Sequence, residues 1–289
     1  MKKALVIIFL SVICFQLSAQ NEGRIGIFQG VSKTSLFNAD DAAFGDYLPT
    51  IKPTIGVEAG YHFTLFHALP MGFSVQFSRN GAGQNYRGYY VDSTSYYAYT
   101  RLTYLRSGIA LHMGTNPRRQ VSLAISYGAN IGFLANYQER YEIIRYNNDR
   151  YILDIKNNDV SVHDTSDIKG TLTSALYNKT DLNVFGSLGL NFLLSKNWVF
   201  GFYGRLDYGL SPVDNTQKIN VNYDTQPSTS ANFKLFNSKV KYHGPTNDLV
   251  THGATNNIGY GVYLTLKYRI YNKEKIEFYY KENRKYNHQ

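Results

Sequence analysis

The most regular pattern of hydrophobic and polar positions lies in residues 121–137. Every odd position from Val121 to Tyr137 is apolar or aromatic, and the even positions hold Ser, Ala, Gly, Asn and a single Leu. Alternation over so long a stretch predicts a β-strand. A sandwich strand would also alternate, but its water-facing side would normally carry Lys, Glu, Arg or Thr. Small residues suit the inside of a narrow closed barrel, so we interpret the odd side as facing lipid.

Seven further segments alternate in the same way, some of them less cleanly. They are residues 24–32, 54–66, 71–78, 103–113, 182–194, 198–210 and 258–270. Together with the first segment they predict eight strands, an even number. About thirteen residues at ~3.3 Å each and a tilt of ~40° rise about 33 Å, which is enough to cross an apolar band of ~25 Å.

The connections between these strands alternate between short and long. The short ones contain Pro, Gly or Asn, and their sequences are HALP, GTNPRRQ and SKN. The long ones are residues 38–50, 79–98, 138–180 and 211–256. Long extracellular loops opposite short periplasmic turns are typical of outer-membrane barrels. We therefore expect an all-β fold, an eight-stranded antiparallel up-and-down transmembrane β-barrel.

Two long loops contain additional alternating pieces, YILDIK at 151–156 and FKLF at 233–236. We interpret them as strand continuations or hairpins above the membrane. The alternative is that one loop hides two more barrel strands, which would give ten.

The N-terminal residues have the pattern of a secretory signal peptide. Lys2 and Lys3 precede an apolar run, and a small-residue cleavage site ends at Ala19. A lipoprotein would use Cys14, but the preceding Ile13 is not small, so the cleavage site before Gln20 fits better. We expect a signal peptide at 1–19, a barrel at 20–270 and a short charged periplasmic tail at 271–289, too short to hold a folded domain.

Composition agrees with an exported membrane protein. The chain has 26 Tyr and 17 Phe against 1 Trp, and amphipathic rings are favoured at membrane interfaces. No run of eighteen apolar residues follows the signal peptide, so no transmembrane helix is expected. The net charge is +9 without a concentrated basic patch, so nucleic acid is not an expected partner. We expect location in the outer membrane, with outer-membrane lipid as a partner and envelope or secretion proteins meeting the loops or tail.

Two segments resemble a known family. Residues 104–112, YLRSGIALH, look like the fourth strand of small bacterial outer-membrane β-barrel proteins of the PorT and OmpA-like kind, and residues 204–213, GRLDYGLSPV, are similar to their seventh strand. The resemblance covers essentially the whole mature chain, but its motifs are loose. Gly108 stands where the family usually has Pro, and the chain runs nineteen residues past the last strand. Some relatives serve secretion and others anchoring, so the resemblance does not fix function.

Two sets of side chains follow from the predicted faces. Those expected to face lipid include Val121, Leu123, Ile125, Ile131, Phe133, Trp198, Phe200, Phe202, Leu264 and Leu266. Those expected to face the lumen as a polar network are Glu58, His62, Arg106, His112, Arg205, Asp207 and Lys267. Because an unpaired buried charge is costly, we expect Glu58 and Asp207 to pair with the arginines and to fill the lumen. The alternatives are a gated narrow channel or ligand site among the same groups, and a place at the periplasmic rim for Lys267 and Arg269.

Signals for catalysis are weak, and we expect no catalytic residue, metal site or cofactor. The seven histidines lack zinc-site spacing, and no Gly-x-Ser-x-Gly elbow occurs. Ser161, His163 and Asp164 are neighbours in a polar loop, which we interpret as a solvated cluster. The expected function is a non-enzymatic envelope-structural, binding or secretion-accessory role; a narrow porin-like channel and, behind it, an outer-membrane enzyme are the alternatives.

Overall fold

The structure is a computed structural model that describes eleven stretches of the chain: residues 22–37, 46–65, 69–89, 95–115, 119–144, 150–163, 168–171, 176–214, 240–243, 248–251 and 255–271. The expected signal peptide, the tail beyond residue 271 and the FKLF segment lie outside these residues. No helix in the described stretches is long and apolar enough to cross a membrane.

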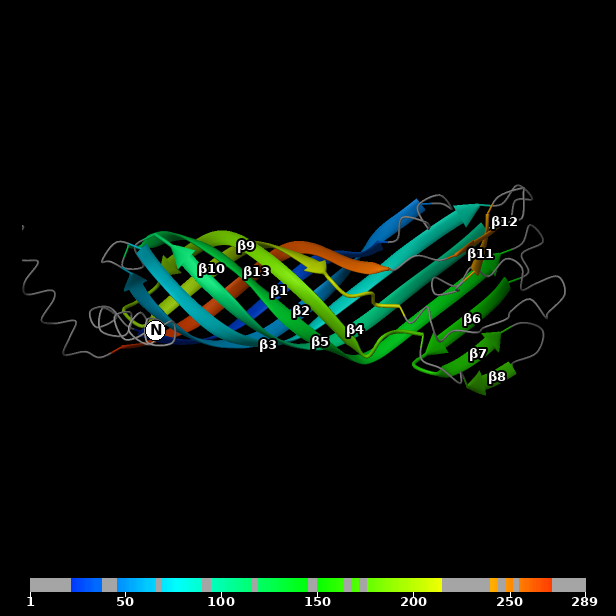
Figure 1. The fold of residues 1–289 in the computed structure, drawn as a ribbon, viewed down its shortest axis with the longest axis horizontal. Coiled ribbons are helices and arrows are strands. Elements are labelled where there is room, and N and C mark those ends of the chain that lie inside the picture. Colours follow the sequence, from blue (N-terminus) through cyan, green and yellow to red (C-terminus); the bar gives the residue numbers. More distant parts are fainter. Residues whose placement is uncertain are drawn as a thin grey trace, which may run out of the picture.

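A closed antiparallel barrel forms most of the molecule (Figure 1). Its strands are β1 (Glu22–Phe37), β2 (Asp46–Leu65), β3 (Leu69–Tyr89), β4 (Ser95–Gly114), β5 (Val121–Ile144), β9 (Thr180–Leu193), β10 (Trp198–Gly209) and β13 (Asn256–Tyr271). The hydrogen-bonded order is β4-β3-β2-β1-β13-β10-β9-β5, and the pairing of β4 with β5 closes the circle. The predicted eight-stranded barrel is therefore confirmed, and the ten-stranded alternative is wrong.

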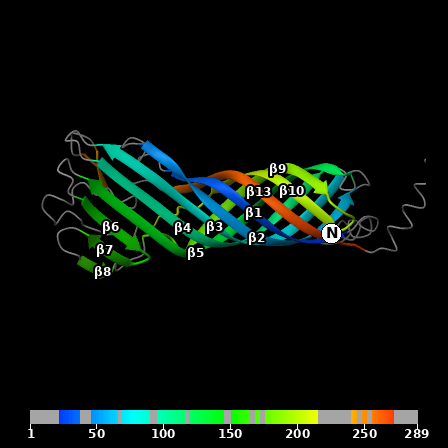
Figure 2. The same cartoon turned by 180° about the vertical axis from the view of Figure 1, so that it is seen from behind.

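Several strands continue well past the end of the predicted segments. β5 goes on beyond the barrel and pairs with β6 (Arg150–Lys156), which is followed in the sheet by β7 (Asp159–His163) and β8 (Ile168–Thr171). We call these three strands, with the adjoining ends of β3, β4 and β5, the platform; Figure 2 shows it projecting from one end of the barrel. A separate hairpin joins β11 (Val240–His243) to β12 (Asp248–Thr251).

The prediction of a long loop at residues 79–98 was wrong. Residues 79–98 were expected to be irregular, but most of them belong to β3 and β4, whose pairing continues without a break to Tyr89 and Ser95. The alternation of apolar and polar residues fades there because both faces of the sheet leave the apolar belt, while the backbone ladder needs no such pattern. The YILDIK segment forms β6, so the predicted strand at 151–156 is confirmed.

Opposite faces of each strand have opposite characters. Large apolar side chains are exposed all around the outer face, whereas Gly, Ser, Thr and charged residues fill the inner one. Aromatic rings occupy the middle of the lumen, where Phe28, Tyr203 and Tyr263 form a buried cluster with Ala124. A Cβ at Gly30 would collide with the Tyr263 ring, so glycine at this position lets the ring lie against the barrel wall.

Candidate functional site: the charged lumen

Charged side chains from six barrel strands meet inside the barrel and form what we call the lumen network. All seven predicted lumen residues lie on the inner face, and five of them are buried, with His62 and Arg205 partly accessible. The structure adds members that the sequence interpretation left out: Glu22, Arg24, Gln76 and Asp181. It also brings in Arg269, for which the periplasmic rim was an alternative position.

The central ion pair joins Lys267 on β13 to Glu58 on β2. Both side chains are almost fully buried, and Gln76 donates a hydrogen bond of 3.2 Å to the same carboxylate. The strand between them is β1, and Gly26 pairs with Lys267 on one side and with Glu58 on the other. A Cβ at Gly26 would come within 2.8 Å of the Lys267 side chain, so the glycine lets the lysine cross β1 and reach the acid.

This pairing corrects the expected partner of Glu58. We predicted an arginine, but the nearest base is Lys267, because the glycine on β1 brings two strands that are not neighbours into side-chain contact. Lys267 therefore lies in the lumen and not at the rim.

A second group lies nearer to the end with the short turns. Arg269 donates hydrogen bonds to Glu22 from both Nε, at 2.7 Å, and Nη2. Arg24 contacts the other oxygen of the same carboxylate, with its Nε at 2.6 Å. One acid thus holds two buried bases. Arg269 also donates its backbone N–H to Asn197 in the turn between β9 and β10.

A third group lies toward the platform. Arg106 donates to Asp181 at 2.9 Å, and both side chains are buried, with 3% and 0% of their surface exposed. Arg106 also lies 4.0 Å from Asp207, which Arg205 contacts at 2.8 Å. The guanidinium of Arg205 lies 3.8 Å from the centre of the Phe185 ring, a cation–π arrangement. Asp207 thus pairs with arginine, as expected, and Asp181 adds a second acid.

Two histidines occupy the space between the charged groups. His112 is bonded through one ring nitrogen to Ser74 and through the other to Ser126, both at 2.8 Å. Its ring centre lies 5.2 Å from that of His62. No group of three or more metal-ligating side chains forms in the described stretches of the chain. Both ring nitrogens of His112 are engaged by hydroxyls, so the arrangement is typical of a buried, hydrogen-bonded histidine.

Little empty space is left among these groups. One cavity beside Glu58, His112 and Lys267 measures about 40 Å³, and another beside Arg24 and His62 about 30 Å³. A single water needs roughly 10–15 Å³ of such volume, so each cavity has room for only two or three waters. The described part of the lumen is filled by side chains.

The outer residues chosen from sequence point away from this network. Eight of the ten are exposed on the outer face, and Phe200 and Leu266 are half-buried between neighbours. Their contact with lipid stays a prediction. Ser161 and His163 lie on β7 of the platform, and Asp164 lies outside the described residues.

The alternation of the sequence could have identified some of the lumen residues that the prediction left out. Asp181 immediately precedes Leu182 and therefore shares the inner face with Asn183, and Arg24 shares the inner face with Gly26 and Phe28 by the same alternation. Glu22 had no such signal because it precedes the predicted first strand. Alternation alone could have found Asp181 and Arg24.

Comparison with known proteins adds a family. A family model described as an outer membrane protein beta-barrel domain matches residues 16–215. Similar solved structures include Neisserial surface protein A, at 10% identity and a TM-score of 0.31, covering 83% of this chain and 95% of that one. Another is Ail, the attachment invasion locus protein of Yersinia pestis, at 11% identity and a TM-score of 0.28, covering 86% and 99%. No curated protein matches the chain.

Proposed function

Because the chain belongs to the outer membrane protein beta-barrel domain family, we propose that it is a non-enzymatic outer-membrane anchor that displays its platform at the cell surface. The observation that carries this proposal is the filled lumen. Three groups of paired charges and a cluster of rings occupy the barrel, and two cavities among the described residues measure about 40 and 30 Å³. A barrel with such an interior is suited to rigidity more than to transport.

The platform supports the display role. β5 runs without interruption from the barrel wall into the platform, so movement of the platform is resisted by the barrel. Ion pairs fasten the platform strands to one another: Arg140 lies 3.4 Å from Asp154, and Arg150 lies 2.6 Å from Glu142. The hydrogen bond from Arg150 to Glu142 raises the pKa of that arginine above its ordinary value. A stiff sheet held beyond the membrane can present a binding surface to other molecules.

Envelope or secretion proteins are the partners we propose for this surface, in keeping with the PorT-type and OmpA-like resemblance. The proposal includes export by the signal peptide at 1–19 and a lipid environment for the outer face. The competing function is a narrow channel through the lumen.

Conductance in planar bilayers tests the proposal against the channel. We expect no discrete current steps from the inserted wild-type barrel, because paired charges and buried rings occupy its lumen. Steady current steps whose ion selectivity changes in Lys267→Gln would overturn the anchor.

Insertion and orientation need their own measurement, for which cysteine labelling is suited because Cys14 is the chain's single cysteine and lies in the expected signal peptide. Lys156→Cys, on the platform, should react with a membrane-impermeant maleimide on intact cells. Lys196→Cys, in the short turn between β9 and β10, is the matched control and should react only after permeabilisation. Labelling of Lys196→Cys alone on intact cells would contradict the proposed display.

A further inference from the structure

Basic side chains gather on one side of the outer wall, at the platform end of the apolar belt. Four consecutive strands each contribute one: Lys33 on β1, Lys52 on β2, Arg79 on β3 and Arg101 on β4. We call them the cation row. The outward positions of β10 and β13 at the same end carry Leu206, Tyr208, Ile258 and Tyr260 instead. These four strands therefore differ in charge from β10 and β13 at the same end.

The position of Lys52 depends on an irregularity in β2. The register between β2 and β3 shifts between Pro49 and Ile55, and the Lys52 side chain lies against the outer side of Gly81 and Gly83. A Cβ at either glycine would come within 3.0 Å of that side chain. The two glycines thus make room for an aliphatic stem that carries its charge across β3 toward β4.

Among the described residues, no acid lies between Lys52 and Arg101 to balance their charges. Gly83 pairs with Arg101, and the Cε atom of Lys52 would lie 3.0 Å from a Cβ at Gly83, so the end of the Lys52 side chain extends toward the position of Arg101 on the neighbouring strand. In the described stretches no carboxylate forms an ion pair with any member of the cation row. Crowded cations without a counter-charge are the arrangement expected where a bound anion supplies that charge.

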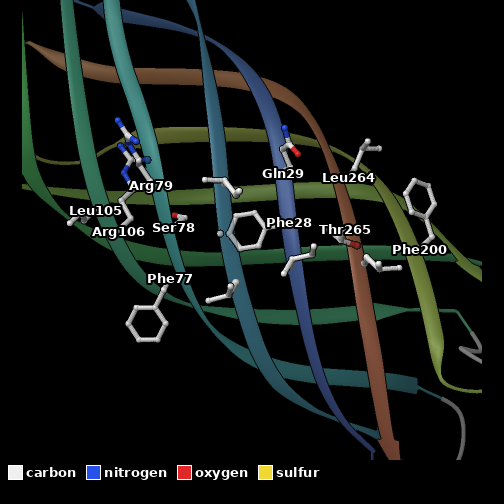
Figure 3. A pocket seen from close by; sticks show the side chains of 15 residues that line it. Phe28, Gln29, Phe77, Ser78, Arg79, Leu105, Arg106, Phe200, Leu264 and Thr265 are labelled. Atoms are coloured by element: carbon white, nitrogen blue, oxygen red, sulfur yellow. The ribbon is translucent and has the colours of Figure 1, made fainter.

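An apolar pocket adjoins the cation row on the outer wall (Figure 3). It has a volume of about 660 Å³ and is lined mainly by outward apolar side chains of β10, β13, β1, β2, β3 and β4, among them Ile55, Phe77 and Leu264. Phe28 and Arg106, whose side chains belong to the lumen, also contribute to the lining. Arg79 belongs both to the row and to the lining of the pocket, and Figure 3 shows it at one edge, with Phe200 and Leu264 at the opposite edge. A charged group and an apolar chain could therefore be bound side by side.

The position of the cation row along the barrel axis fits the level of lipid headgroups. Along β4 the outward residues change from Ile109 and Leu105 to Arg101 and then to Tyr99 and Tyr97. Amphipathic aromatic rings favour the membrane interface, which places Arg101 at the level of the headgroups and the pocket at the level of the acyl chains.

We propose that the cation row and the adjoining pocket form a binding site for one phosphate-bearing membrane lipid, with its phosphate on Lys52, Arg79 and Arg101 and an acyl chain in the pocket. The fork of a guanidinium matches phosphate oxygens in pairs, which favours phosphate over a zwitterionic or neutral headgroup. The site lies on the outer wall and does not depend on the display function.

Native mass spectrometry of the purified barrel tests this site. The probes are dioleoyl phosphatidic acid and dioleoylglycerol, which share their chains and differ in the phosphate. We expect one phosphatidic acid to stay bound and dioleoylglycerol to be lost. The triple variant Lys52→Gln/Arg79→Gln/Arg101→Gln should bind phosphatidic acid at least about tenfold more weakly, because three charge-assisted contacts are removed.

The control is Arg140→Gln/Lys156→Gln/Lys196→Gln, which removes three cations elsewhere and should bind like the wild type. Heat-modifiable gel mobility verifies that each barrel is folded. If the triple variant does not fold, the single variant Arg101→Gln replaces it, and we expect this variant to weaken the binding of phosphatidic acid in part. Equal retention of dioleoylglycerol, equal binding by the triple variant, or displacement of the lipid by an equal concentration of inorganic phosphate would each overturn the lipid site.

Discussion

Replacing Arg106 by Met should destabilise the barrel strongly. Arg106 contacts Asp181 at 2.9 Å, and the Asp181 side chain is completely buried. Asp207 keeps its other partner, Arg205, at 2.8 Å. Methionine retains most of the length of the arginine side chain, so the loss of packing is small, and the main consequence is an acid left without its base.

The size of the effect follows from this geometry. Two unit charges 2.9 Å apart interact by about 5–6 kcal/mol at an effective dielectric constant of 20, and the burial of both groups opposes part of that gain. Removing one member of a buried pair typically costs about 3–5 kcal/mol, because the remaining charge is desolvated without compensation. We expect Arg106→Met to lower the free energy of unfolding by that amount.

Urea unfolding in lipid vesicles measures this change. Trp198 is the only tryptophan of the chain and lies on the outer face at the short-turn end, where its fluorescence reports folding without direct contact with the substitution. Adding Asp181→Leu to the variant removes the orphaned acid and should recover most of the loss, since apolar replacement of a buried pair is often neutral.

The matched control is Arg140→Met on the platform. Its partner is Asp154 at 3.4 Å, and the arginine side chain is 29% exposed, so the change should cost no more than about 1 kcal/mol. If Arg106→Met costs as little as Arg140→Met, the lumen is hydrated and the reasoning from a filled interior is refuted.

Two further predictions concern the barrel wall and the platform. Ile125 is exposed on the outer face, so Ile125→Arg should cost about 2–4 kcal/mol in vesicles, whereas Ser126→Thr on the inner face should cost less; equal losses would mean that the faces are misassigned. Asn157 in the β6–β7 turn has a φ of 55°, and its side chain accepts a hydrogen bond of 3.1 Å from the Tyr137 backbone N–H. Both Asn157→Val and Asn157→Gly lose this bond, but only valine is strained at such a φ, so Asn157→Val should destabilise the hairpin by about 1–2 kcal/mol more than Asn157→Gly. Hydrogen exchange of the β6 and β7 amides would show whether Asn157→Val and Asn157→Gly differ.

Alternation made the barrel predictable because the membrane imposes it. Each strand that crosses the apolar belt has one side toward an apolar surrounding and the other toward a packed lumen, so the odd residues of 121–137 were enough to assign faces. Beyond the belt both faces become polar, which is why the continuation of β3 to Tyr89 left no signal.

Partners inside the lumen were harder to predict than faces. The alternation placed Glu58 and Lys267 on inner faces but could not show that Gly26 separates them and lets them meet. Which charged residues form ion pairs in a narrow barrel depends both on where the charges lie and on which positions between them lack a side chain. Within the cation row, Lys52 had no such signal either, since it reaches the outer wall only through the register shift in β2.

The seam of the barrel joins its first and last strands, with β1 paired to β13 from Glu22 and Tyr271 to Phe37 and Asn256. The same last strand carries Lys267 and Arg269, whose acids are Glu58 on β2 and Glu22 on β1. Until β13 arrives, these acids lack their β13 partners, and an open sheet leaves them in reach of water. Circle closure and charge neutralisation are thus coupled, because both need β1 and β13 to meet. A chain truncated before β13 would keep most of its strands and yet expose Glu58 and Glu22, an incomplete intermediate that quality-control proteases could distinguish from the finished barrel by its charge.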